Sequence, residues 1–251
     1  MMPQAADIQN VAKAGRAVQP MRRRPPTFTL WPSDLAYVWE DCRRCFYLQV
    51  ARGVRRPRTP FPAIFIQIDR IMRCYFAGRD IVRIVEGMPP GTIDCREQAV
   101  RSTPIGLPGY AARCVISGRY DSVVRFADGS YGLIDFKTRD PRTAGAGLLW
   151  RQLHAYAYAL EHPAPGRPLL APITRLGLLR VGPTAMGRIR GSPRRYALCS
   201  DTVWIECPRD ERAFIAFLRQ VLDVLSRPDL PPAAPSCQFC RYRVLARRLP
   251  A

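Results

Sequence analysis

The chain has 251 residues, 47% of them hydrophobic, and a formal net charge of +19 with a pI of about 10.4. This length allows one substantial core, and no apolar run reaches the roughly 18 residues of a transmembrane helix, so we expect a soluble, cytoplasmic protein rather than a membrane protein. The excess charge is carried almost entirely by arginine, whose planar fork pairs with phosphate oxygens, and it favours nucleic acid as the partner. An arginine-biased composition would explain the shortage of lysine but not the net excess, and charge alone does not separate an enzyme from a binding protein.

The N-terminal segment, residues 1–27, is small, polar or basic in character and has no core periodicity. It is predicted to be a flexible basic tail that can lie along a phosphate backbone. An arginine-bearing presequence is the alternative, although the amphipathic pattern is ragged.

Two helices are predicted before residue 80. Ser33 is a good N-cap for a helix with apolar residues at helical spacing that ends at Gly53. Residues 62–78 form the second helix. The turn-rich segment 80–108 is interpreted as a connection to the next elements.

Residues 116–126 and 131–138 are predicted to form two paired antiparallel strands. The turn sequence Ala127-Asp128-Gly129-Ser130 separates them, and an Asp-Gly turn flanked by β-branched residues is a strong hairpin signal. Because side chains two apart on a strand share a face, Asp135 and Lys137 lie together while Phe136 points into the opposite layer. The hairpin brings Asp121 back towards this pair.

Two carboxylates and an ammonium would therefore converge at one spot. Carboxylate oxygens suit Mg²⁺ or Mn²⁺, which keep several waters and take few protein ligands. A lysine beside a metal-bound water can orient that water and help to deprotonate it, and the pKa of the lysine is readily lowered there. The arrangement suits hydrolysis of a phosphodiester by a metal-activated water. The alternative is a solvated strand edge. However, Lys13 and Lys137 are the only lysines in this arginine-rich chain, which favours a specific role for Lys137.

A helix is predicted from Gly147 to Glu161, with Gln152 and Tyr156 four residues apart on one face. Three motifs now follow in order: Gly118-Arg119-Tyr120-Asp121, Ile134-Asp135-Phe136-Lys137-Thr138, and Gln152-x-x-x-Tyr156. Together they resemble the PD-(D/E)XK nuclease superfamily in its RecB-like branch, closely over residues 116–160 and loosely elsewhere. The resemblance implies that Gln152 and Tyr156 line the site and contact nucleic acid.

The resemblance also implies a metal site. Asp121 and Asp135 would bind the metal with the backbone carbonyl of Phe136, and Lys137 would serve the attacking water. The RecB-like branch completes the site with an acid or histidine on the second helix, where Asp69 is the available acid. A salt bridge from Asp69 to an arginine of the same helix is an equally favoured alternative.

The C-terminal part supplies further elements. Residues 163–172 form a proline-rich loop, 174–181 a buried strand, 195–206 a strand or hairpin, and 208–226 a helix that packs on the sheet. The connection between the two strands is a flexible basic loop that could reach a nucleic-acid backbone. Its arginines are Arg188, Arg190, Arg194 and Arg195.

Two Cys-x-x-Cys pairs, Cys42 with Cys45 and Cys237 with Cys240, lie near opposite ends of the chain. They can supply the four thiolates of an iron–sulfur cluster or of a Zn²⁺ site, either of which would join the two ends. Nucleases of the AddB kind and CRISPR-adaptation exonucleases, both RecB-like, carry a cluster that joins an N-terminal cysteine to C-terminal ones, and Cys42, Cys237 and Cys240 match that layout. This chain lacks a third C-terminal cysteine, so Cys45 would have to be the fourth ligand. The choice between an iron–sulfur cluster and a zinc ion therefore stays open. The alternative for Cys45 is a buried packing role in the first helix.

Nine cysteines without a signal-peptide pattern favour a reducing compartment, and their odd number disfavours a complete set of disulfides. The cysteines outside the two pairs are interpreted as packing residues: Cys74, Cys95, Cys114, Cys199 and Cys207. His154 points away from the face of Gln152 and Tyr156 and is interpreted as structural.

These observations predict an α/β domain over residues 28–251, with a central mixed β-sheet flanked by helices as in restriction-endonuclease-like folds. The cysteine-ligated metal site would join its termini. The predicted function is a metal-dependent deoxyribonuclease, an exonuclease or end-processing enzyme, with DNA ends or single strands as substrates and a recombination or CRISPR-adaptation complex as a source of protein partners. The alternative is a catalytically inactive nucleic-acid-binding or assembly module, and RNA processing is a third candidate.

Overall fold

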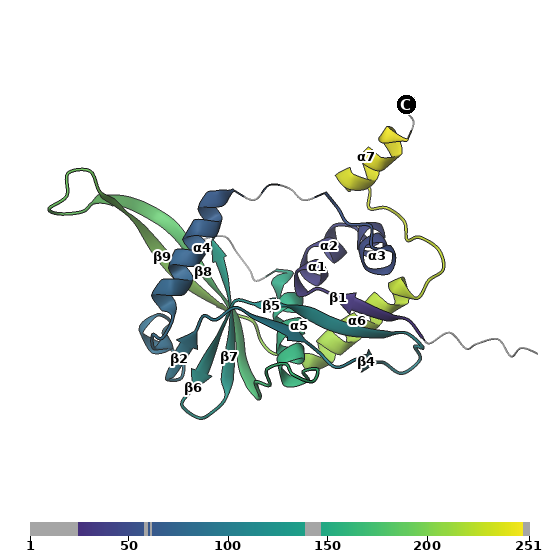
Figure 1. Cartoon of the computed structure of the whole chain (residues 1–251), viewed down its shortest axis with the longest axis horizontal. Coiled ribbons are helices and arrows are strands. Elements are labelled where there is room, and N and C mark those ends of the chain that lie inside the picture. Colours follow the sequence, from purple (N-terminus) through teal and green to yellow (C-terminus); the bar gives the residue numbers. More distant parts are fainter. Residues whose placement is uncertain (1–24, 58–59, 61, 139–146, 248–251) are drawn as a thin grey trace, which may run out of the picture.

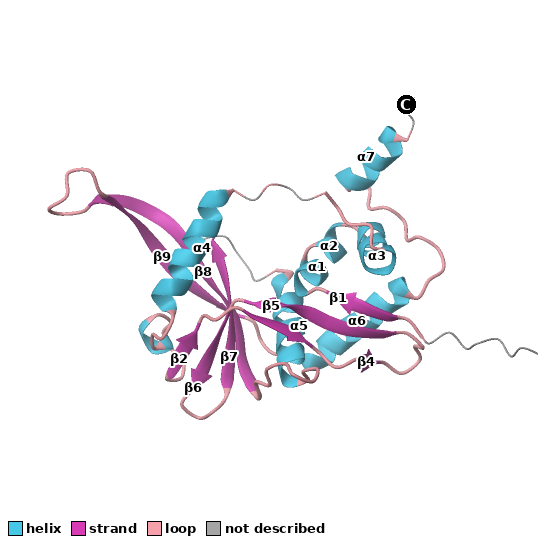
Figure 2. Ribbon diagram, viewed as in Figure 1, coloured by secondary structure: helices cyan, strands magenta, loops and turns pink. Residues whose placement is uncertain are grey.

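A computed structural model describes residues 25–57, 60, 62–138 and 147–247. They form two β-sheets that meet near the middle of the molecule, with helices packed against both (Figure 1, Figure 2). This confirms the predicted α/β class with mixed sheets flanked by helices. Most of the predicted tail, residues 1–24, lies outside the described residues, and Thr27 is already the first residue of a strand.

The first sheet is built around one central strand, β5 (Arg113–Tyr120). It pairs in parallel with β1 (Thr27–Leu30), and in antiparallel fashion with β3 (Gln98–Arg101) and the short β4 (Ile105–Gly106). The second sheet has the order β2-β6-β7-β8-β9. Its strands are β2 (Gly91–Asp94), β6 (Ser122–Phe126), β7 (Tyr131–Thr138), β8 (Ile173–Arg188) and β9 (Tyr196–Glu206); β7 and β8 run parallel, and the other neighbours run antiparallel.

The hairpin of β6 and β7 confirms the predicted antiparallel pair, but the predicted first strand, 116–126, is wrong as a single element. The chain leaves the first sheet at Tyr120 and enters the second at Ser122. Between them, the Asp121 side chain accepts the N–H of Phe136 at 3.3 Å. The N–H of Phe136 is thus bonded to a side-chain carboxylate and not to a backbone carbonyl of the neighbouring strand. Asp121 lies at the point where the two sheets meet.

Three short helices replace the predicted long helix that ends at Gly53: α1 (Pro32–Ala36), α2 (Val38–Asp41) and α3 (Arg43–Arg52). Ser33 is not the N-cap; Trp31 holds that position, and Pro32 provides the favourable first helical residue. The chain turns to extended geometry at Cys42, which interrupts the helix. Gly53 ends α3 as expected, with a φ of 68° that suits glycine.

The remaining helices are α4 (Ala63–Phe76), α5 (Leu149–Glu161), α6 (Glu211–Leu225) and α7 (Gln238–Ala246). The first three confirm the predictions, whereas α7 was not predicted. The interpretation of 80–108 as a connection is wrong, because this segment forms a single 3-10 turn (Ile81–Arg83) and the strands β2, β3 and β4. None of the described helices is both long and apolar enough to cross a membrane.

Two apolar clusters hold these layers together. The larger packs helices α1, α2, α3, α5 and α6 against the first sheet and against one face of the second. Within it, Trp39 makes edge contacts with Phe46 and Phe217 at ring separations of 5.1 and 5.5 Å. The smaller joins α4 to the second sheet, where Phe76 stacks on Phe136 at 5.7 Å. Phe136 therefore points away from Asp135 and Lys137, as strand alternation predicts.

Candidate functional site

Asp121 and Asp135 come together at the end of the β6–β7 ladder. The last registered pair there is Ser122 with Ile134, so Asp121 and Asp135 occupy the next opposed positions. Asp135 is only 3% exposed. Burial and the neighbouring Asp135 carboxylate raise the pKa of Asp121 to about 7, although Arg73 and Lys137 oppose the rise. The two carboxylates thus concentrate negative charge where little water reaches it.

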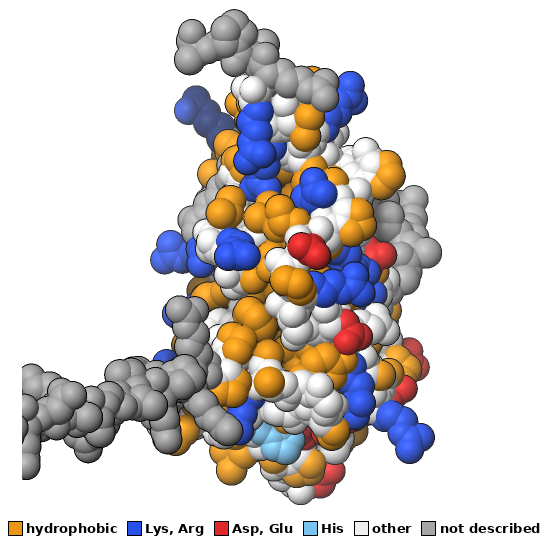
Figure 3. All heavy atoms as spheres, turned by 90° about the vertical axis from the view of Figure 1, so that its right-hand side faces the viewer, with side chains coloured by type: hydrophobic (Ala, Val, Ile, Leu, Met, Phe, Trp, Pro, Cys, Tyr) orange, Lys and Arg blue, Asp and Glu red, His pale blue; other side chains and the backbone are white. Residues whose placement is uncertain are grey.

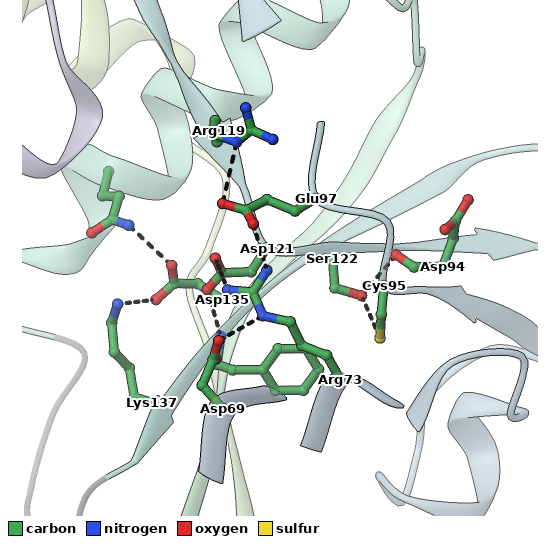
Figure 4. A network of polar contacts seen from close by, with 12 residues as sticks. Asp69, Arg73, Asp94, Cys95, Glu97, Arg119, Asp121, Ser122, Asp135 and Lys137 are labelled. Atoms are coloured by element: carbon green, nitrogen blue, oxygen red, sulfur yellow. Dashed lines mark hydrogen bonds and ion pairs between the residues drawn. The ribbon is translucent and has the colours of Figure 1, made fainter. Parts of the chain in front are cut away.

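Both oxygens of Asp135 face polar side chains. Gln152, on α5, donates to Oδ1 at 3.0 Å, and Nζ of Lys137 lies 2.6 Å from Oδ2 (Figure 4). Burial acts to lower the pKa of Lys137, but the Asp135 carboxylate and other nearby groups, Asp121 among them, together outweigh it and the pKa rises. The contact with Asp135 thus favours the ammonium form of Lys137, whereas the lowered pKa was expected for a lysine beside a metal-bound water.

Arg73, on α4, connects the site to three acidic residues. Its guanidinium lies 2.8 Å from Asp69, 3.0 Å from Asp121 and 3.8 Å from Glu97 (Figure 4). Asp69, the predicted third metal ligand, is thus held in the alternative salt bridge. Glu97 also lies 3.4 Å from Arg119. Neither Arg73 nor Glu97 lies in the sequence motifs that predicted the site, so both are additional residues of it.

Helix α5 lies against both sheets and directs its predicted face into the site. Gln152 and Tyr156 are both buried. The ring of Tyr156 lies so close to the backbone of Gly118 that a Cβ there would be 3.0 Å from it. Burial raises the pKa of Tyr156, so its phenol stays protonated and can donate a hydrogen bond. The structure therefore brings together Asp121, Asp135, Lys137, Gln152 and Tyr156, as the motifs predicted.

His154 has the structural role expected. It is buried, its Nε2 accepts the N–H of Asp210 at 2.8 Å, and its Nδ1 lies 2.7 Å from the carbonyl oxygen of Trp150. With Nε2 accepting, Nδ1 carries the proton and donates to that carbonyl. Burial lowers the pKa of His154, which favours this neutral form.

The four paired cysteines form a second centre, next to α3 and α7 and apart from the acidic site. Cys42, Cys45, Cys237 and Cys240 are all buried, and their four Sγ atoms lie within 4.8 Å of one another. Burial acts to raise the pKa of Cys42, but hydrogen bonds from the backbone N–H groups of Ala234 and Cys45 help to bring it to about 7. This confirms that a thiol cluster joins the N- and C-terminal regions of the fold, with Cys45 as a member.

The other cysteines only partly follow their predicted role. Cys114 and Cys207 are buried, and Cys95 is half-buried. Cys74 and Cys199 are exposed, so the packing interpretation is wrong for these two. Cys199 lies on the part of β9 that extends beyond the sheet, where neither strand face is covered.

The family model of the PD-(D/E)XK nuclease superfamily matches residues 75–245, which is more than half of the chain. The chain belongs to this superfamily. One solved structure, described as the crystal structure of SSO0001, is similar at 15% sequence identity and a TM-score of 0.40, covering 88% of this chain and 85% of that chain. No curated protein sequence matches at a significant level.

PD-(D/E)XK proteins are typically phosphodiester hydrolases that use divalent metals, and the donor set of this chain fits such an ion. Asp121 and Asp135 provide hard oxygen donors, and burial together with the neighbouring Asp135 carboxylate raises the pKa of Asp121, so that a cation would favour its ionised form. The side-chain oxygen of Gln152 is also buried without a hydrogen-bond partner among the described residues. Superfamily membership thus indicates a nuclease that acts on nucleic acid.

Proposed function

We propose that this protein is a metal-dependent deoxyribonuclease of the RecB-like branch, an exonuclease or end-processing enzyme. The observation that carries the proposal is the opposed pair of Asp121 and Asp135, with Lys137 2.6 Å from Asp135. Paired acids with an adjacent lysine match what phosphodiester hydrolysis needs: anionic metal ligands and a proton-handling group at one place. Its protein partners would be members of a recombination complex or a CRISPR-adaptation complex, as for AddB-type and CRISPR-adaptation nucleases.

In the proposed mechanism each side chain has a separate task. Asp121, Asp135 and the carbonyl of Phe136 would hold Mg²⁺ or Mn²⁺, and the ion would supply Lewis acidity to the scissile phosphate and lower the pKa of the attacking water. Lys137 would orient that water by donating a hydrogen bond to it. Gln152, through its bond to Asp135, fixes the carboxylate orientation. Asp69 is proposed as a metal ligand only if it leaves its salt bridge with Arg73.

Charge on the outer surface supports nucleic acid as the partner. β8 and β9 continue beyond the sheet as a two-stranded arm, residues 183–203, with an exposed tip (Figure 1). Its arginines are Arg188, Arg190, Arg194 and Arg195, all exposed. Elsewhere basic side chains are scattered over the surface, as on the face seen in Figure 3. We propose that the arm contacts the phosphate backbone outside the cleavage site.

A catalytically inactive binding or assembly module is the second candidate, and Arg73 is the observation that favours it. The guanidinium already pairs with Asp121 and Asp69, so it neutralises two of the proposed metal ligands. A fold in which arginine permanently replaces the metal would keep its nucleic-acid surface and lose cleavage.

A cleavage assay separates these two functions. End-labelled single- and double-stranded DNA is incubated with Mg²⁺, Mn²⁺ or EDTA, and the wild type is compared with Lys137→Ala and Asp135→Asn. Asp128→Asn, in the exposed turn of the same hairpin, is the matched control. Ion-dependent cleavage that both site variants lose and the control keeps supports the nuclease. Intact DNA that still shifts on a gel, with every ion tested, supports the binding module, and labelled RNA in parallel tests the third candidate.

A further inference from the structure

The spacing of the four thiols distinguishes between the two kinds of metal centre considered for them. Sγ of Cys45 lies 3.6 Å from Sγ of Cys237 and 3.6 Å from Sγ of Cys240, and Sγ of Cys42 lies 3.8 Å from Sγ of Cys240. No two of the four Sγ atoms are more than 4.8 Å apart. The sulfurs thus enclose a very small space.

A single tetrahedral ion fits that space. Zn²⁺ binds thiolate sulfur at about 2.3 Å, so a regular tetrahedron of sulfurs around it has edges of about 3.8 Å. In a four-iron cluster each thiolate binds a different iron, and the irons and bridging sulfides lie between the thiolates. The sulfurs are then held farther apart than around one ion. The observed spacing matches the single ion and leaves no room for the cluster.

We propose that Cys42, Cys45, Cys237 and Cys240 bind one Zn²⁺ ion in a closed, structural site. Four thiolates complete the tetrahedron, so no position is left for a substrate or water, which is the arrangement of structural rather than catalytic zinc. This inference does not depend on the proposed nuclease activity, because the acidic site shares none of these residues.

The groups around the sulfurs are suited to a site of net negative charge. The N–H of Ala234 donates to Sγ of Cys42 at 3.4 Å, and Nη2 of Arg56 lies 4.0 Å from Sγ of Cys237. Arg56 is fixed by an ion pair with Asp41 at 2.8 Å and by contact with the ring of Phe239 at 4.8 Å. A cation and an N–H donor beside the thiolates offset the charge that four of them leave around one divalent ion.

The site also explains how α7 is held. Cys240 is the only buried residue among the described residues of this helix. The cysteine cluster and the few apolar residues around it are separate from the two large apolar clusters. In Figure 1 α7 stands at the edge of the molecule beside α3. Because α7 buries no broad apolar face, its attachment depends on Cys240, on Cys237 at its N-cap and on Phe239, which packs against the cluster.

Metal analysis of the full chain tests the proposal. Protein expressed with both iron and zinc, and purified without oxygen, is analysed for metals, acid-labile sulfide and visible absorption. We expect about one zinc per chain, no labile sulfide and no visible band. Iron with labile sulfide, a single iron, or a metal-free chain with four freely titrating thiols would each overturn the proposal.

Variants locate the ion. Cys45→Ser and Cys240→Ser are expected to lose zinc, whereas Cys199→Ser, at an exposed thiol, is expected to retain it. If the site variants do not fold, a mercurial titration of the wild type replaces them: zinc should be released only after the exposed Cys74 and Cys199 have reacted, and release should accompany the reaction of four further thiols. Release that does not follow the reaction of these thiols would place the zinc elsewhere and contradict the assignment.

Discussion

Nη2 of Arg73 lies 3.0 Å from Oδ1 of Asp121, so an arginine holds a carboxylate that we propose as a metal ligand. Its positive charge repels an incoming cation, and removing it should strengthen metal binding. For Arg73→Gln at pH 8.5 we expect about tenfold tighter Mn²⁺ binding, which corresponds to about 1.4 kcal/mol, measured by electron paramagnetic resonance. Arg70→Gln, an exposed arginine of the same helix, is the control. Unchanged or weaker binding would mean that Arg73 orients Asp121 rather than competing with the metal.

The raised pKa of Asp121 predicts a specific pH dependence of stability. In the folded chain this carboxyl keeps its proton up to about pH 7, whereas its ordinary pKa is 3.8. The folded state therefore binds more protons between these values, and this group lowers the free energy of unfolding by up to about 1.4 kcal/mol per pH unit as the pH rises.

Asp121→Asn removes that slope. In buffer without Mg²⁺ or Mn²⁺, its stability relative to wild type should increase from pH 5 to pH 7 and then level off, as measured by urea unfolding. The effect of Arg73 is already contained in the raised pKa of Asp121, so exchanging the neutral carboxyl for an amide adds only a constant offset. Asp229→Asn, at an exposed loop position, is the control for the same chemical change. A flat difference between Asp121→Asn and the wild type would show that the Asp121 carboxyl is ionised throughout.

Gly118 leaves room for the ring of Tyr156. An added Cβ would lie 3.0 Å from Cε1 of Tyr156 and 3.0 Å from Cδ of Pro32, which is tighter than ordinary contact. Gly118→Ala should cost about 1–2 kcal/mol of stability and displace the tyrosine from the proposed site, reducing cleavage about tenfold. At Gly106, an added Cβ would meet only Arg113, at 3.9 Å, among the described residues. Gly106→Ala should therefore leave stability and cleavage unchanged. Full cleavage by Gly118→Ala would argue against a positioned Tyr156.

The arm predicts a salt-dependent contribution to DNA binding. Replacing Arg188, Arg190, Arg194 and Arg195 by glutamine should weaken DNA binding about tenfold at moderate salt. The slope of log K against log salt should fall by about 0.9 for each phosphate that the variant no longer neutralises. The control carries the same charge change at exposed positions outside the arm, Arg167, Arg212, Arg219 and Arg227. Equally weakened binding in the two variants would mean that only net charge matters.

The proximity of Asp121 and Asp135 could be predicted because it follows from local rules. The Asp-Gly turn sets the register of β6 and β7, and strand alternation then places Lys137 with Asp135 and turns Phe136 to the other face. The four-residue spacing on α5 likewise put Gln152 and Tyr156 on one side.

The Arg73 network could not be predicted in this way. Its members come from α4, from the residue before β3 and from the end of β5, and only tertiary packing brings them together. Glu97 lay in a segment interpreted as a connection, because strands of four residues or fewer carry too little alternation to be recognised. The break between β5 and β6 at Asp121 was not predicted either, because no turn sequence marks it. There the Asp121 side chain accepts a backbone N–H of β7.

The thiol cluster joins cysteines that are synthesised at widely separated times during translation. Cys237 follows Cys45 by 192 positions, so at ordinary rates of translation the second pair of thiols emerges roughly 10–40 s after the first. Throughout that interval Cys42 and Cys45 form a bare dithiol on a growing chain, which oxidants and free metal ions can reach before the fold encloses it. The yield of correctly assembled protein should therefore depend on the redox state and metal supply during synthesis itself, and not only on those of the finished molecule.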